Sequence, residues 1–239
     1  MSGFYTNGVP APSTTNGAFP FTGSETIPMD TNNARGVGPE TVGATLSQLA
    51  SYLSGDVPWV TGRFYGLPKG ATPVAVLTVA STLYAYPVYV PNTATVSTLN
   101  IGVTTGQTGG AAHVGIYADN GSGYPGDLVY DSGAVSGLTS TTVVTKSSVA
   151  TTLQAGLYWI ATIFTASSTF PSVSAITANY GCALNAMLGS DTAAHMLATS
   201  GEAATGISVA GTYGALPATF TAGATLTLNA ATPVISIGV

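Results

Sequence analysis

The chain has 239 residues, of which 45% are hydrophobic and only 5% are charged, with a net charge of −5. This length fits one large β domain, or a small module followed by a medium domain. Four basic residues against nine acidic ones leave no basic stripe to neutralise phosphates, so nucleic acid is not an expected partner. Because a typical soluble domain is about 25% charged, the surface must consist of neutral polar and small residues, and we expect the protein to work in an assembly.

Residues 1–38 are expected to form an extended arm, because they are rich in Pro, Gly, Asn and Thr and lack periodicity. The N-terminus lacks the basic region and the apolar region of a signal peptide. The single cysteine, Cys182, cannot form an intrachain disulfide. We therefore expect synthesis in a cytoplasm. Ordering an extended segment costs about 1–2 kcal/mol per residue in backbone entropy, so its apolar side chains should bind a neighbouring subunit. These expected anchors are Phe4, Tyr5, Phe19, Phe21, Ile27 and Met29.

One short helix for attachment or trimerisation is expected over residues 39–55. Pro39 suits a first helical turn and Gly55 suits the stop after the last turn. Between them, apolar side chains recur at the i, i+4, i+7 and i+11 spacing of one helical stripe. We expect this stripe to pack around a three-fold axis, on the surface of a partner, or on the chain's own β domain. Its residues are Val42, Leu46, Leu49 and Leu53.

Residues 56–72 are interpreted as a linker, and residues 73–239 as a β-sandwich, because turn signals recur every 8–12 residues. The most apolar stretch, residues 74–90, is broken by Thr, Ser and Pro, which predicts strands and no membrane insertion. Within it, Pro87 predicts an edge strand or a bulge. Strands are predicted over residues 73–80, 82–91, 94–104, 111–118, 127–131, 141–152, 156–166, 173–178, 181–188, 206–213, 223–230 and 233–238.

The stretch 112–132 carries the candidate site, with two strands flanking a loop rich in Gly, Asn and Asp. A strand at residues 153–164 is expected to complete the central pairing of the sandwich. The stretch holds Asp119, Asp127 and Asp131, whose carboxylates are ligands that calcium accepts, although their spacing is not that of an EF-hand. The favoured alternative is turn chemistry, in which Asp and Asn side chains bond nearby amides. Paired carboxylates for glycoside hydrolysis are a third alternative.

Other catalytic signals are sparse, so we expect no enzymatic activity and no cofactor. His113 lies in an alternating strand and is interpreted as a sheet-face residue. One cysteine and two distant histidines do not make a zinc site, and neither a G-x-S-x-G elbow nor a phosphate-binding loop is present. Tyrosines of the strands and loops can stack on sugar rings or pack internally. If a glycan binds, the expected contacts are Asp119, Tyr124 and Asp127.

Two stretches resemble proteins of tailed-bacteriophage virions. GIYADNGSGYPGDLVYDSG, followed by TLQAGLYWIA, resembles a β-sandwich module found in fibre and tail-associated proteins. ETIPMDTNNARGVGPETVGATLSQLASYL is similar to N-terminal segments of phage structural proteins. The resemblances cover residues 25–53 and roughly 64–170. Their motifs are structural and carry over no active site.

The resemblance implies a homotrimeric virion component with a jelly-roll-like sandwich, in which Tyr158 and Trp159 pack in the core. It implies a head fibre or capsid-decoration protein that is fixed to the particle by its arm and assembled in the host cytoplasm. The alternatives are a tail fibre or receptor-binding subunit that holds host surface glycans, and a polysaccharide depolymerase. The expected partners are therefore copies of this chain, other capsid or tail proteins and, in the receptor-binding alternative, a glycan.

Overall fold

The computed structural model describes the backbone of Thr26–Asp30 and Thr41–Thr45 and, with side chains, residues 57–67, 74–76, 78–79, 81–165, 170–177, 188–194, 204–228 and 230–239. The chain divides into two compact units, Met1–Gly55 and Asp56–Val239. Seventeen strands run through the described residues. In this part of the chain, no helix is long and apolar enough to cross a membrane.

The first unit contains an antiparallel pair of strands, β1 (Thr26–Asp30) and β2 (Thr41–Thr45), whose register pairs Ile27 with Ala44 and Met29 with Val42. The prediction of a helix from residue 39 is therefore wrong at β2. Two threonines and a valine in five residues favour a strand, and Gly43 weakens a helix interior. The remaining expected attachment residues lie outside the described residues: Phe4, Tyr5, Phe19, Phe21, Leu46, Leu49 and Leu53.

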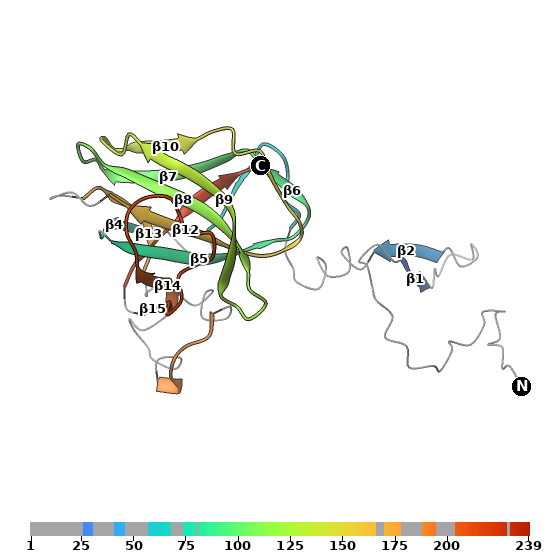
Figure 1. The fold of residues 1–239 in the computed structure, drawn as a ribbon. Coiled ribbons are helices and arrows are strands. Elements are labelled where there is room, and N and C mark those ends of the chain that lie inside the picture. Colours follow the sequence, from blue (N-terminus) through green and yellow to red (C-terminus); the bar gives the residue numbers. More distant parts are fainter. Residues whose placement is uncertain are drawn as a thin grey trace, which may run out of the picture. The chain divides into compact units, whose positions relative to one another are not determined.

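The second unit is a sandwich of two antiparallel sheets (Figure 1). The six-stranded sheet has the order β15 (Thr225–Leu228), β14 (Ala204–Ala210), β5 (Thr82–Val90), β12 (Gly156–Phe164), β8 (Ala111–Asp119) and β9 (Pro125–Ser136). The seven-stranded sheet has the order β16 (Thr232–Pro233), β13 (Ser172–Ile176), β7 (Thr98–Thr105), β17 (Ile235–Gly238) and β3 (Phe64–Tyr65), with β10 (Thr142–Lys146) on β7 and β4 (Val74–Leu77) on β13. A short pair joins β6 (Ala94–Val96) to β11 (Thr151–Leu153).

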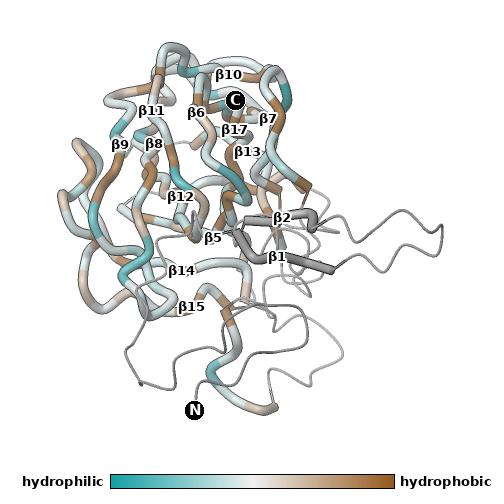
Figure 2. Tube along the Cα trace, turned by 90° about the vertical axis from the view of Figure 1, so that its right-hand side faces the viewer, coloured by the Kyte–Doolittle hydropathy of each residue, from teal (hydrophilic) through white to brown (hydrophobic). Residues whose placement is uncertain are grey.

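The main hydrophobic core fills the space between the two sheets. Figure 2 shows β8, β9 and β12 on one side and β7, β13 and β17 on the other, with hydrophobic segments along them. Tyr86 of β5 is fully buried, and its hydroxyl donates to the carbonyl of Ile235 at 2.7 Å and accepts from the amide of the same residue at 3.0 Å. Because Ile235 belongs to β17, this one side chain ties the two sheets together.

Most predicted strands coincide with observed ones, although 94–104 and 141–152 each divide into two strands and β9 is longer than the predicted 127–131. The expected central pairing of β8 with β12 is confirmed. Pro87 lies beyond the residues of β5 that pair with β14, so β5 is locally an edge there, as its sequence predicts. The segment expected as a linker contributes β3, which pairs with β17. The predicted strand 181–188 lies outside the described residues except for its last residue, which is helical.

Candidate functional site

The loop between β8 and β9 is held by the side chains of its own first residues. One carboxylate oxygen of Asp119 accepts from the amides of Gly121 at 2.8 Å and Gly123 at 3.4 Å. The other accepts from the indole Nε1 of Trp159 at 2.9 Å. Both oxygens of this expected ligand therefore accept hydrogen bonds from the protein, and the turn alternative describes its contacts best.

Asp131 lies on β9 and connects three parts of the sandwich. Its Oδ1 accepts from the amide of Gly133 at 2.9 Å and lies 3.2 Å from Nδ1 of His113. Its Oδ2 accepts from the amide of Leu216 at 2.9 Å, across 85 positions of sequence. The ring of His113 also packs edge-on against Tyr213, with ring centroids 5.2 Å apart. These contacts place His113 and Asp131 in a structural network on the sheet.

The other two residues proposed for ligand contact are exposed. Asp127 accepts a hydrogen bond from the hydroxyl of Thr219 at 3.0 Å, and Tyr124 is 42% exposed at the end of the loop. Asp119, Asp127 and Asp131 thus serve three different sets of partners. Among the described residues, no three His, Cys, Asp or Glu side chains are grouped so that they could hold a metal ion.

A segment that the sequence did not single out covers the outer face of the six-stranded sheet. It comprises residues 211–224 between β14 and β15 and is called the strap here; in Figure 1 it is the dark red loop that leaves β14 and crosses the sheet. Leu216 and Phe220 of the strap are buried against a second hydrophobic cluster on that face. The sheet contributes Leu83, Ala85, Tyr117, Trp159, Ala161, Ile163 and Ile207 to this cluster.

Backbone hydrogen bonds fix the strap along the free edge of β9. The amide of Phe220 donates to the carbonyl of Gly126 at 2.9 Å, and the amide of Leu128 donates to the carbonyl of Ala218 at 2.8 Å. The hydroxyl of Tyr117 donates to the carbonyl of Pro217 at 2.8 Å. Burial raises the pKa of the Tyr117 hydroxyl, and the negative charge of Asp131 raises it further. The strap therefore pairs with an edge that would otherwise be open.

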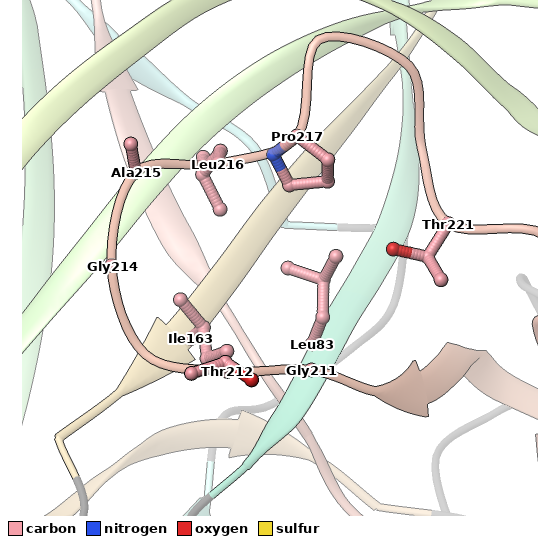
Figure 3. A pocket seen from close by; sticks show the side chains of 9 residues that line it. All are labelled: Leu83, Ile163, Gly211, Thr212, Gly214, Ala215, Leu216, Pro217 and Thr221. Carbon is pink, nitrogen blue, oxygen red and sulfur yellow. The ribbon is translucent and has the colours of Figure 1, made fainter.

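A cavity of about 200 Å³ lies between the strap and the sheet (Figure 3). Leu83 of β5 and Ile163 of β12 form its floor, while Thr212 and Thr221 lie at its rim. Within the strap itself, the sequence signals for this site are two large apolar residues, Leu216 and Phe220, in a segment otherwise typical of a polar loop. The other lining residues are Gly211, Gly214, Ala215, Leu216 and Pro217.

No protein-family model matches the chain, and neither a curated protein nor a solved structure matches it.

Proposed function

We propose that the chain is a non-enzymatic structural protein of a tailed-phage virion, a head fibre or capsid-decoration protein. The observation that carries the proposal is the division of the chain into Met1–Gly55 and Asp56–Val239. The stretch that resembles phage leader segments, residues 25–53, lies within the first unit. The stretch that resembles the virion sandwich module, residues 64–170, lies within the second. In this proposal the first unit grips the particle and the second is displayed as a jelly-roll-like sandwich in a homotrimer.

The contacts of the ionisable side chains support a structural role. Asp119 holds its own loop and the indole of Trp159, and Asp131 holds His113 and the strap. A general acid or base needs a proton that it can exchange with a substrate, whereas these groups serve the fold. The low charged fraction of 5% gives little charge repulsion between molecules, so it suits a surface that contacts neighbouring subunits.

The test is a reconstruction of the particle with and without residues 1–55 of this chain. We expect the intact chain to occupy three-fold positions on the head surface and the truncated chain to be absent from the particle, with host adsorption unchanged. Density for the chain at the tail, or attachment of the truncated chain to the head, would contradict the proposal. Light scattering of the purified full chain measures the expected trimer independently.

The alternative function is that of a tail fibre or receptor-binding subunit that holds host surface glycans. Its support is Tyr124, which is 42% exposed on the loop that follows Asp119 and precedes β9, a place where an aromatic ring can stack on a sugar. If purified full chain competes with phage for adsorption to host cells and Tyr124→Ala removes that competition, this alternative replaces the first. Tyr89→Ala is the matched control, because Tyr89 is similarly exposed at 37% but lies on β5 and not on this loop.

A further inference from the structure

The cavity under the strap has walls that the fold holds in place. Its floor projects from the central strands β5 and β12, and its rim belongs to the strap (Figure 3). The strap is fixed at its first residue by the amide of Gly211, which donates to the carbonyl of Ser81 at 2.9 Å. It is fixed near its centre by the amide of Leu216, which donates to the carboxylate of Asp131 at 2.9 Å. A ligand would therefore enter a site that is already ordered and would not have to order the strap.

The volume of the cavity limits its ligand to one small ring. The cavity measures about 200 Å³. An apolar cavity of about 150 Å³ is large enough to bind benzene, whereas pockets for drug-sized ligands measure about 300–1,000 Å³. The available space therefore fits a six-membered ring with its substituents, and a larger molecule would have to extend beyond the rim.

The lining is apolar below and polar above. Leu83 and Ile163 are buried at the floor and Leu216 is buried on the strap side, while Thr212 and Thr221 are exposed at the rim. Figure 3 shows the hydroxyl oxygen of Thr221 directed towards the cavity. Neither rim hydroxyl makes a hydrogen bond within the described part of the chain.

This lining selects among the small rings that would fit. None of the lining residues carries a charge, so an ionised ligand would lose hydration without gaining an ion pair. A wholly apolar ring would leave the exposed rim hydroxyls bonded to water, whereas a ring with one apolar face and outward hydroxyls can contact both layers. That description fits a neutral pyranose.

We propose that the cavity between the strap and the six-stranded sheet binds one neutral pyranose unit. The C–H face of the sugar lies on Leu83 and Ile163, and its hydroxyls bond to Thr212 and Thr221 at the rim. The site is separate from the loop that carries Tyr124. It goes beyond the proposed virion role and does not depend on where the chain lies on a particle.

The test is saturation-transfer difference NMR on the purified full chain with methyl glycosides of neutral hexoses and 6-deoxyhexoses. For a single small ring we expect a Kd on the order of millimolar. Thr221→Trp fills the rim and should abolish transfer, while Thr221→Val removes one hydroxyl and should weaken binding about two- to tenfold. Thr139→Val is the matched control, because Thr139 is exposed, makes no hydrogen bond in the described residues, and does not line the cavity. It should leave the Kd unchanged.

Two comparison ligands decide the chemical class. Methyl glucuronide should bind at least tenfold more weakly than its neutral counterpart, and phenol should not displace the sugar. The proposal is overturned if no neutral pyranose binds, if phenol binds in preference, or if both Thr221 variants bind as the unaltered chain does. Circular dichroism confirms that each variant is folded, and Thr212→Val provides a second rim variant if Thr221→Trp does not fold. Failure here would leave the particle reconstruction unaffected, so the two proposals fail separately.

Discussion

Replacing Asp131 with alanine should weaken the attachment of the strap to β9 and lower the stability of the sandwich. The carboxylate accepts from the amides of Gly133 and Leu216, both at 2.9 Å, and contacts His113 at 3.2 Å. In the alanine variant the amides of Gly133 and Leu216 and the ring of His113 stay near the sheet but lose the carboxylate as their partner. The strap then retains its hydrophobic contacts and its pairing with β9 while losing the hydrogen bond nearest its centre.

The magnitude follows from the two backbone hydrogen bonds. A hydrogen bond to a charged group contributes about 1.5–3 kcal/mol, so the two together contribute about 3–6 kcal/mol. The side chain of Asp131 is 21% exposed, and water can replace part of this loss. We therefore expect the free energy of unfolding to fall by about 2–4 kcal/mol. For a unit of this size, that corresponds to a decrease in Tm of roughly 4–16 °C.

The assays are urea unfolding for the free energy and amide hydrogen exchange for the strap. Asp127→Ala is the matched control, because Asp127 also lies on β9 and contacts the strap through Thr219 but is exposed. Its substitution should change stability by no more than about 0.5 kcal/mol. If the two alanine variants are equally stable, or if exchange at residues 211–224 is unchanged in Asp131→Ala, the assigned role of Asp131 is refuted.

Three further changes test the sandwich. Tyr86→Phe removes the hydroxyl that joins the sheets through the backbone of Ile235 and should lower the free energy of unfolding in urea by about 1–3 kcal/mol. Gly206→Ala would place its Cβ 2.6 Å from the carbonyl oxygen of Ala85 and should lower Tm, at a cost of about 1–3 kcal/mol. Burial raises the pKa of Tyr86 and Tyr117, so the unfolded chain ionises first and stability, measured in urea, should fall as pH rises above about 10.

Each of these predictions has an outcome that contradicts it. Tyr89→Phe is the control for Tyr86→Phe, because Tyr89 lies on the same strand but is 37% exposed; equal effects of the two changes would exclude the bridging role. An unchanged Tm in Gly206→Ala would show that β14 can move away from β5 without cost. For the pH dependence, the phenolate absorbance reports ionisation directly. If all tyrosines ionise fully near pH 10 while the circular dichroism of the folded chain is intact, the raised pKa values of Tyr86 and Tyr117 are contradicted.

Most strands of the sandwich were predictable because the alternation and the turn residues that mark a strand lie within it or next to it in the sequence. Alternation and turn residues give β8 and β12 nearly as the structure has them and locate the central part of β9. Asp119 holds its turn through amides only two and four positions away. The helix prediction is wrong at β2 for an equally local reason. The apolar stripe at helical spacing predicts a helix, but the β-branched residues and glycine of Thr41–Thr45 favour a strand.

The strap was not predictable, because its contacts are not local. Its composition, with Gly214 and Pro217, is typical of a solvent-exposed loop. The hydrogen bond between Leu216 and Asp131 spans 85 positions, and that between Tyr117 and Pro217 spans 100. No spacing rule connects residues so far apart. The candidate cavity depends on the same long-range contacts, so it could be found only once the chain was folded.

The sequence nevertheless contains a sign that something must cover the six-stranded sheet. Six consecutive residues of β12, from Trp159 to Phe164, are buried, as are six of β8, from Ala112 to Tyr117. A strand with one solvated face alternates, whereas a strand covered on both faces is a continuous run of buried residues. Gly115 completes the fit, because a Cβ at that position would collide with Leu216 of the strap. The run WIATIF therefore indicates a third layer over this sheet, and the strap supplies it.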